Sequence, residues 1–176
     1  MINQHFLHEC FEYSNGALIW KERPAHHFKS KRGFNSFNTQ FAGKIAGRCN
    51  CRGYWQVGLS GHRLLNHRVI WMMFHGDIPQ NYEIDHVNHV KGDNRIENLR
   101  LVTHMENGKN QSAGKNNKSG FNGVLKSKEG NRWRAFISVN RKKIHLGSFL
   151  TKQAAIQARK SAEIKYGYHA NHGGLA

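Results

Sequence analysis

The chain has 176 residues, 38% of them hydrophobic and 22% charged, which is room for one ordinary domain or two small ones. It carries 27 Lys and Arg against 11 Asp and Glu, a formal net charge of +16. Such a charge predicts a polyanionic partner, and nucleic acid is the leading candidate because neutralising phosphates releases counterions. Charge alone leaves a ribosomal or merely soluble basic protein open. No stretch approaches about 18 apolar residues and the N-terminus has no signal-peptide core, so we expect a cytoplasmic protein without a membrane span.

The N-terminal part predicts short strands. Apolar runs at 16–20, 43–47 and 53–59 are separated by Gly and polar clusters, a pattern typical of strands and turns. The polar, basic segment 26–40 predicts a long loop, and loops of that length are often functional. We therefore expect a β-rich N-terminal extension over residues 1–42, whose role the sequence leaves open.

Three cysteines bear on the question of a zinc site. Cys10, Cys49 and Cys51 are odd in number and include a Cys-X-Cys pair, which fits no disulfide framework. A structural zinc site usually takes four ligands with CxxC-type spacing. Although the 13 His residues could complete a site, we expect no structural zinc. A zinc-stabilised nucleic-acid module stays an alternative reading.

The middle of the chain predicts a helix, a hairpin and a second helix. Residues 67–75 are almost continuously apolar and end at Gly76, a residue typical of a helix C-terminus. Residues 82–88 predict a strand that places Asp85 and His86 on opposite faces. A polar turn follows, 98–103 predicts the returning strand, and a second helix begins at His104.

The segment 83–107 gathers five of the eleven acidic residues of a basic chain. Phosphodiester hydrolysis needs a base that activates water and a cation that stabilises negative charge. Asp85 and a side-chain amide on the following helix could supply oxygen ligands to Mg²⁺. His86 suits the role of the base because an unperturbed imidazole has a pKa of about 6.5. An Asn on the neighbouring strand could fix the tautomer of its ring.

Residues 67–107 closely resemble the HNH endonucleases of the homing and phage type. The shared pattern is hydrophobic-Asp-His, then Asp-Asn-Arg, Glu-Asn-Leu and Glu-Asn, in order and at matching distances. The resemblance covers roughly residues 43–110 and implies a ββα-metal nuclease domain there.

The resemblance also implies roles for individual residues. Asp85 matches the metal-ligand aspartate and His86 the general base. Asn98 matches the asparagine that orients the base through its backbone or side-chain carbonyl. Asn107 matches the second metal ligand, where many relatives have His; His104, one turn earlier, is the reserve ligand.

Three residues of the polar turn have simpler readings beside the functional one. Asp93 and Asn94 are typical turn-forming residues, and we expect that role for them. Arg95 is a candidate DNA-phosphate contact, with a salt bridge to Glu97 or Glu83 as the alternative.

The C-terminal part predicts a separate small domain. Residues 111–118 read as a flexible, positively charged linker. Beyond it, three alternating segments between 121 and 149 predict an antiparallel meander, and 151–167 predict a helix with Thr151 as its N-cap. Residues 119–172 resemble the AP2 DNA-binding domain, which is also found appended to HNH nucleases.

The AP2 resemblance implies that the sheet enters the major groove and the helix packs behind it. Trp133 then belongs to the core. The residues expected to face DNA are Arg132, Arg134, Ser138, Lys143 and His145.

Together these patterns predict an α+β protein: a β-rich extension, an HNH core and a small AP2-like domain. The predicted function is metal-dependent endonuclease action on double-stranded DNA, with one divalent ion, Mg²⁺ or alternatively Mn²⁺. One centre per chain predicts a monomer that nicks, whereas double-strand cleavage needs a dimer or two successive cuts. The alternatives are a DNA-binding regulator with an inactive nuclease centre and, less favoured, an RNA substrate.

Overall fold

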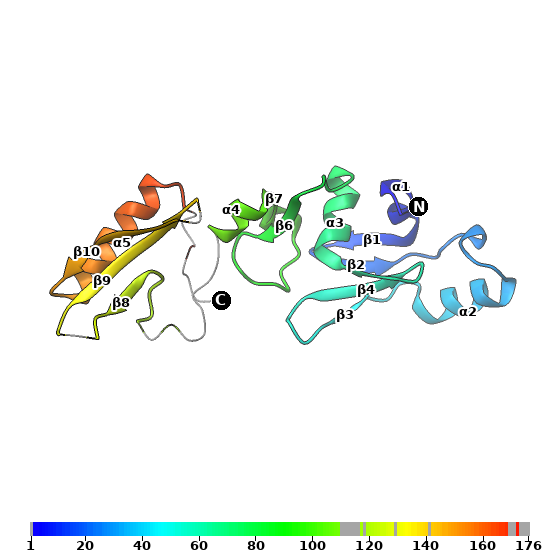
Figure 1. The fold of residues 1–176 in the computed structure, drawn as a ribbon. Helices are drawn as coiled ribbons and strands as arrows, with labels where there is room; N and C mark the ends of the chain where they lie inside the picture. Colours follow the sequence, from blue (N-terminus) through cyan, green and yellow to red (C-terminus); the bar gives the residue numbers. More distant parts are fainter. Residues whose placement is uncertain are drawn as a thin grey trace. The chain divides into compact units, whose positions relative to one another are not determined.

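The computed structural model describes residues 2–109, 117, 119–128, 130–140, 142–168 and 172. The chain divides into two compact units, residues 1–104 and 105–176, which are described separately. Each combines helices with small antiparallel sheets (Figure 1). The predicted linker at 111–118 lies almost entirely outside the described residues and stays a prediction, as do the domain boundaries. In the described part of the chain, none of the helices has the length and apolar character needed to cross a membrane.

The first unit contains three small sheets, ordered β1-β2, β3-β4-β5 and β6-β7. Its elements are α1 (Gln4–Cys10), β1 (Phe11–Ser14), β2 (Ala17–Trp20), η1 (Ala25–His27), α2 (Lys31–Phe41), β3 (Arg48–Cys49), β4 (Trp55–Leu59), β5 (His62–Leu65), α3 (Asn66–His75), β6 (Tyr82–His86), η2 (Ile96–Asn98) and β7 (Leu99–Thr103). The predicted helix at 67–75 is confirmed by α3, which ends at Gly76 with a φ of 80°.

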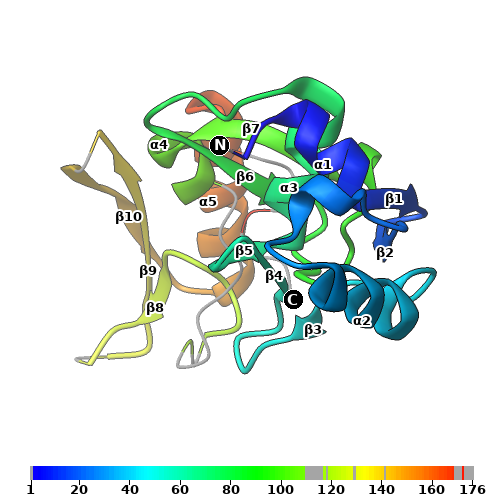
Figure 2. The ribbon, with the colours of Figure 1, turned by 90° about the vertical axis from the view of Figure 1, so that its right-hand side faces the viewer.

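A single apolar core joins the N-terminal segment to the segment that carries the predicted HNH pattern. Helices α1 and α3 lie side by side and cover the β1–β2 hairpin (Figure 2). The core draws on nearly every element of the unit, and its buried members include Leu7, Phe11, Leu18, Val57, Leu59, Val69, Ile70, Met73, Ile84 and Leu99. Since burial of such side chains is the main favourable term in folding, this shared core stabilises the N-terminal segment and the predicted motif together.

The prediction of a long loop over 26–40 was wrong. The prediction that residues 1–42 are β-rich was wrong for the same reason, because helices make up much of this segment. The segment contains η1 and the 11-residue helix α2, whose N-cap Ser30 accepts a hydrogen bond from the Gly33 amide. Phe34, Phe37 and Phe41 recur at helical spacing and supply its apolar side. Segment 43–47 forms only an isolated bridge, Ile19 with Ile45, rather than a strand.

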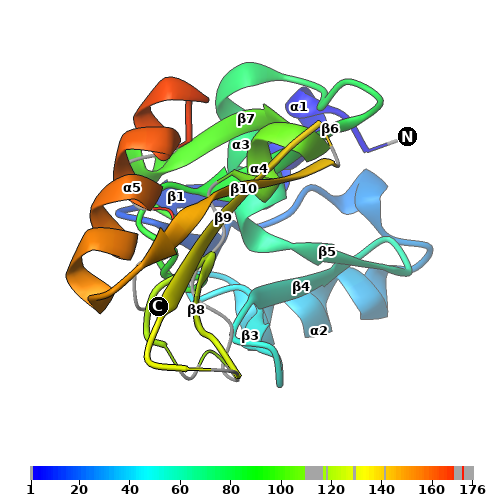
Figure 3. The same cartoon turned by 60° about the vertical axis from the view of Figure 1, so that its left-hand side comes forward.

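The second unit is a three-stranded sheet with one long helix. Helix α4 (His104–Gly108) crosses the boundary of the units, and β8 (Val124–Lys126), β9 (Trp133–Val139), β10 (Lys142–Phe149) and α5 (Lys152–Lys165) follow. The strand order β10-β9-β8 confirms the meander, and α5 covers one face of the sheet (Figure 3). Thr151 caps α5 by accepting a hydrogen bond from the Ala154 amide at 3.2 Å, as predicted.

Strand β9 shows the expected alternation between its two faces. Ala135 and Ile137 are buried, whereas Arg134 and Ser138 are exposed on the other face. Buried Arg159 on α5 donates to the Phe136 carbonyl at 2.7 Å and so ties the helix to the strand. These features agree with the predicted arrangement, but the AP2 resemblance itself stays a prediction.

Candidate active site

The β6–β7 hairpin carries the predicted site residues. Its register pairs His86 with Leu99 and Asp85 with Arg100. Successive side chains alternate between the faces of a strand, so His86 points inward, where it is 4% exposed, and Asp85 points to the other side. The predicted strand, return strand and following helix are confirmed by β6, β7 and α4.

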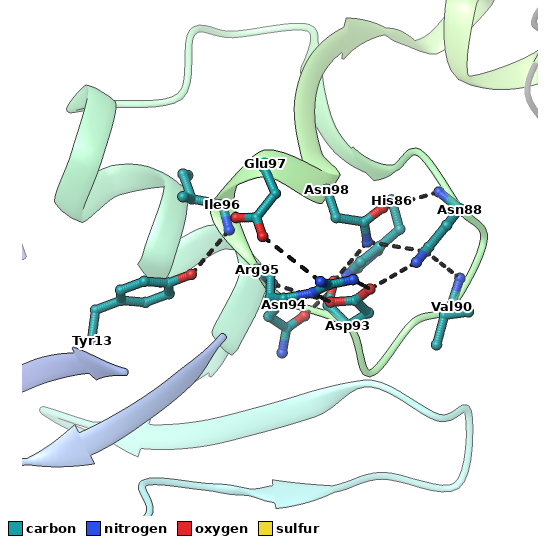
Figure 4. Close-up of polar contacts among 10 residues, drawn as sticks. All are labelled: Tyr13, His86, Asn88, Val90, Asp93, Asn94, Arg95, Ile96, Glu97 and Asn98. Atoms are coloured by element: carbon teal, nitrogen blue, oxygen red, sulfur yellow. Dashed lines mark hydrogen bonds and ion pairs between the residues drawn. The ribbon is translucent and has the colours of Figure 1, made fainter. Parts of the chain in front are cut away.

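The His86 ring is held by Asn94. The ring Nε2 lies 3.0 Å from the Asn94 Oδ1, and the Asn94 side chain is only 2% exposed (Figure 4). Because an amide oxygen only accepts, Nε2 must carry the proton, and in the neutral ring the lone pair is then on Nδ1. This tautomer is ready to take a proton at Nδ1. The sequence assigned Asn94 only to a turn, so this role was missed.

Asn98 holds the loop that follows β6. Its backbone carbonyl accepts from the Val87 amide at 2.9 Å, and its side-chain oxygen accepts from the Asn88 amide at 3.1 Å. Its side-chain amide donates to the Asn88 side chain at 3.0 Å and to the Asp93 carbonyl at 2.8 Å. Asn98 therefore closes the loop next to His86, and its predicted role in orienting the base stays a prediction.

Asp93 and Arg95 form a two-pronged ion pair beside this network. The Arg95 Nε and Nη2 donate to the two Asp93 carboxylate oxygens at 2.8 and 2.7 Å. The Glu97 Oε1 lies 3.8 Å from the Arg95 Nη1. The hydrogen bonds from Arg95, assisted by Asn88, hold the pKa of Asp93 well below its usual range. The salt-bridge alternative for Arg95 is thus realised mainly with Asp93, and its DNA contact stays a prediction.

A second buried histidine packs against His86. His67, on the first turn of α3, is 4% exposed, and its ring lies 4.8 Å from that of His86 in an edge-to-face arrangement. Burial, with smaller contributions from His86 and Arg68, lowers the pKa of His67 from 6.5 to about 3. His67 is therefore neutral at ordinary pH. The sequence placed it in an apolar run, which gives no sign of this contact.

The depressed pKa of His67 predicts a loss of stability in acid. Below pH 6.5 the unfolded chain binds a proton at His67 more readily than the folded chain does, so stability falls as pH drops from 6.5 toward 3. For this residue the loss is about 2 kcal/mol at pH 5. We expect His67→Phe to reduce the difference in unfolding free energy between pH 8 and pH 5 by about that amount, measured by urea denaturation. His62→Phe, at an exposed position of β5, is the control. A wild-type difference between the two pH values in His67→Phe would contradict the lowered pKa of His67.

The outer face of β6 carries the predicted metal ligand. Asp85 accepts two hydrogen bonds from Arg100, both at Oδ2, at 2.8 and 3.0 Å. The reserve ligand His104 lies 3.0 Å from Glu83, two residues before Asp85 on the same face. Asn107 belongs to the second unit, so its place beside Asp85 stays a prediction.

Another group of potential metal ligands lies in the N-terminal segment. Over the described residues, the group of three His, Cys or carboxylate side chains close enough to share an ion is Glu9, His26 and His27. However, Arg23 donates from Nε to the Nδ1 of His27, which places the His27 proton on Nε2, facing Glu9 at 2.9 Å. A metal at this Nε2 would have to displace the proton, so the arrangement favours a hydrogen-bond network of Arg23, His27 and Glu9 over a metal site. Of the cysteines, Cys10 is buried, which raises the pKa of its thiol to about 11, and Cys49 and Cys51 are exposed.

The predicted DNA-facing residues of the second unit all lie exposed. Arg134 and Ser138 project from β9, and Lys143 and His145 from β10, while Arg132 precedes β9. Phe136 lies among them, with the Lys143 Nζ 4.1 Å from its ring centre. Their contact with DNA stays a prediction.

The sequence profile of the HNH endonuclease family matches residues 65–109, which run from the end of β5 through α3, the β6–β7 hairpin and α4. Residues 65–109 form an HNH endonuclease domain. Both the His86–Asn94 pair and Asp85 fall inside this HNH domain, whereas the β1–β2 hairpin lies outside it.

Two viral proteins are similar to parts of the chain. Protein 3.8 of Escherichia phage T7 is 36% identical over 76 residues, which cover 43% of this chain and 63% of the relative. The uncharacterized HNH endonuclease L560 of Acanthamoeba polyphaga mimivirus is 32% identical over 111 residues, which cover 58% of this chain and 57% of the relative. The chain thus spans less than two thirds of either relative. No solved structure matches it.

Proposed function

We propose that the protein is a metal-dependent endonuclease that hydrolyses phosphodiester bonds of double-stranded DNA. The observation that carries the proposal is the buried His86–Asn94 pair, placed beside Asp85 on the hairpin of the HNH domain. A histidine fixed in one tautomer suits proton transfer, and the net charge of +16 suits a polyanionic substrate. The similar mimivirus protein is named an HNH endonuclease.

The proposed chemistry assigns His86 the general-base role. Its Nδ1 takes the proton of the attacking water while Asn94 holds Nε2 and keeps the ring from turning. His67 packs against the ring and, being neutral, adds no competing charge. The base therefore needs little rearrangement when the substrate arrives.

The donor groups fit a hard divalent cation such as Mg²⁺ or Mn²⁺. The Asp85 carboxylate is mostly buried, at 13% side-chain exposure, and oxygen is the ligand type that these ions prefer. Asp85 would hold the ion together with Asn107, or with His104 in its place. When bound, the ion would stabilise negative charge on the phosphoryl and leaving oxygens. Arg100 orients the Asp85 carboxylate through its two hydrogen bonds to Oδ2.

We propose that the exposed face of the β8–β10 sheet binds the DNA. We expect Arg134→Ala to lower DNA affinity by roughly 5- to 100-fold if the guanidinium reads a base, and to reduce the salt slope by about one if it contacts a phosphate. Fluorescence anisotropy at several salt concentrations measures both. Lys160→Ala is the charge-matched control, because Lys160 is an exposed residue of α5, which covers the opposite face of the sheet. Equal effects of the two variants would mean that only overall charge matters.

Incubation of the full chain with supercoiled plasmid tests the proposal. Conversion to open-circle or linear DNA with Mg²⁺ or Mn²⁺, and none with EDTA, is the expected result. Open circles alone would indicate nicking by single centres. Intact plasmid with a clear gel shift would favour a DNA-binding regulator with an inactive centre, and cleavage of RNA alone would replace the substrate.

A further inference from the structure

The turn of the β1–β2 hairpin lies directly against the loop that contains Asn94. Asn15 and Gly16 form a two-residue turn with φ of 44° and 86°. A Cβ placed on Gly16 would lie 2.9 Å from the Arg95 nitrogen and 3.1 Å from the Asn94 carbonyl carbon. Only a residue without a side chain allows this approach, because both neighbours are backbone atoms.

A second contact joins the same hairpin to the same loop. The Tyr13 hydroxyl on β1 accepts a hydrogen bond from the Ile96 amide at 3.1 Å (Figure 4). The Tyr13 ring is itself held edge-to-face by Phe74 of α3, with ring centres 5.0 Å apart. Residues 94–96 are thus fixed from outside the HNH domain by an element about 80 residues earlier in the chain.

We infer that the β1–β2 hairpin is a positioning element for the general base, and that Gly16 and Tyr13 are its contact residues. The chain of contacts runs from Gly16 to the Asn94 backbone, and from the Asn94 side chain to the His86 ring. Displacing the backbone at residue 94 moves the amide oxygen that fixes the tautomer of His86. The inference rests on the proposed function and gives the N-terminal segment a role in it.

The hairpin turn and the Asn94 loop also border a common cavity. Asn15, Gly16, Asn66, Gly92 and Asn94 all line one small cavity of about 180 Å³. Gly16 and Tyr13 contact the loop from the β1–β2 hairpin, and the Asn98 side chain bonds to Asn88 and to the Asp93 carbonyl within it. A shift of the turn would therefore pass directly to the Asn94 side chain.

The chain offers a closely matched control for Gly16→Ala. Ser60 and Gly61 form the equivalent turn between β4 and β5, with φ of 51° and 80°, and a Cβ on Gly61 would meet nothing within 4 Å. Gly61→Ala therefore carries the same positive-φ strain without the collision. We expect Gly16→Ala to lower kcat for plasmid cleavage by ~10–100-fold with unchanged DNA affinity, and Gly61→Ala to leave both near wild type.

A readout that does not need activity is the protonation pattern of the His86 ring. In ¹⁵N-histidine-labelled full chain, wild type and Gly61→Ala should show a protonated Nε2 and an unprotonated Nδ1, and Gly16→Ala a mixture of tautomers. Tyr13→Phe, which keeps the ring and removes only the acceptor, should change the pattern and kcat in the same direction but less. This variant decides the matter if Gly16→Ala does not fold.

The inference is overturned if Gly16→Ala and Tyr13→Phe both keep the wild-type tautomer and kcat. Equal losses in Gly16→Ala and Gly61→Ala would also overturn it, since turn strain alone would then explain the effect. If wild type cuts no DNA, the proposed function fails, while the ring spectra still test the positioning of His86.

Discussion

Replacing His86 with alanine is expected to lower the rate of DNA cleavage by ~10²–10⁴-fold while DNA affinity stays nearly unchanged. The reason is that His86 is the proposed general base, whereas the proposed DNA-binding face lies in the other unit. The measurement pairs single-turnover cleavage with a binding titration. His62→Ala, at an exposed position on β5, is the matched control and should behave as wild type.

The His86 variant also removes a buried ring and leaves the Asn94 oxygen without it. Both effects reduce stability, by about 2–4 kcal/mol together. Assays therefore belong well below the melting temperature, with folding checked by circular dichroism. If a folded His86→Ala protein loses DNA binding along with cleavage, His86 is structural and the base lies elsewhere.

The second large effect is expected to distinguish the role of Asn94 in catalysis from the role of Asn98 in stability. Asn94→Ala should lower kcat by ~10–100-fold with a modest loss of stability, because Asn94 holds the ring of the base. Asn98→Ala should instead reduce the unfolding free energy by about 2–4 kcal/mol, because its side chain serves the Asn88 amide, the Asn88 side chain and the Asp93 carbonyl. Urea denaturation and single-turnover cleavage measure the two effects on the same samples.

The family resemblance assigns the orientation of the base to Asn98 instead of Asn94. The same two variants can therefore also decide in favour of Asn98. A greater loss of kcat in Asn98→Ala at unchanged stability, with Asn94→Ala near wild type, would restore that assignment. Asn88→Ala is the control for the loop, since Asn88 bonds to Asn98 and to Asp93.

The local elements of the site could be predicted from the sequence. The alternation around Asp85 and His86 and the Gly76 stop of α3 are short-range signals, and the structure has the corresponding strand and helix. In the second unit, the Thr151 cap and the alternation of β9 are equally local. Such signals can be interpreted from the sequence alone because they depend on residues that are close together in the chain.

The features that were missed depend on distant contacts. Helix α2 contains Gly, Asn, Ser and Thr, which are weak helix formers, and its stability comes from packing of its Phe side against Arg23 and Trp20. The roles of Asn94 and His67 arise only when β6, the 87–95 loop and α3 meet. The contact between Gly16 and residues 94–95 spans almost half of the chain.

Supercoiled-plasmid cleavage by wild type and His86→Ala side by side, with Mg²⁺ and with EDTA, decides whether the protein is a metal-dependent nuclease that uses His86. We expect open-circle or linear DNA only in the lane that contains wild-type protein and Mg²⁺. Equal cleavage by a folded His86→Ala protein, or cleavage by wild type that EDTA does not stop, would contradict it.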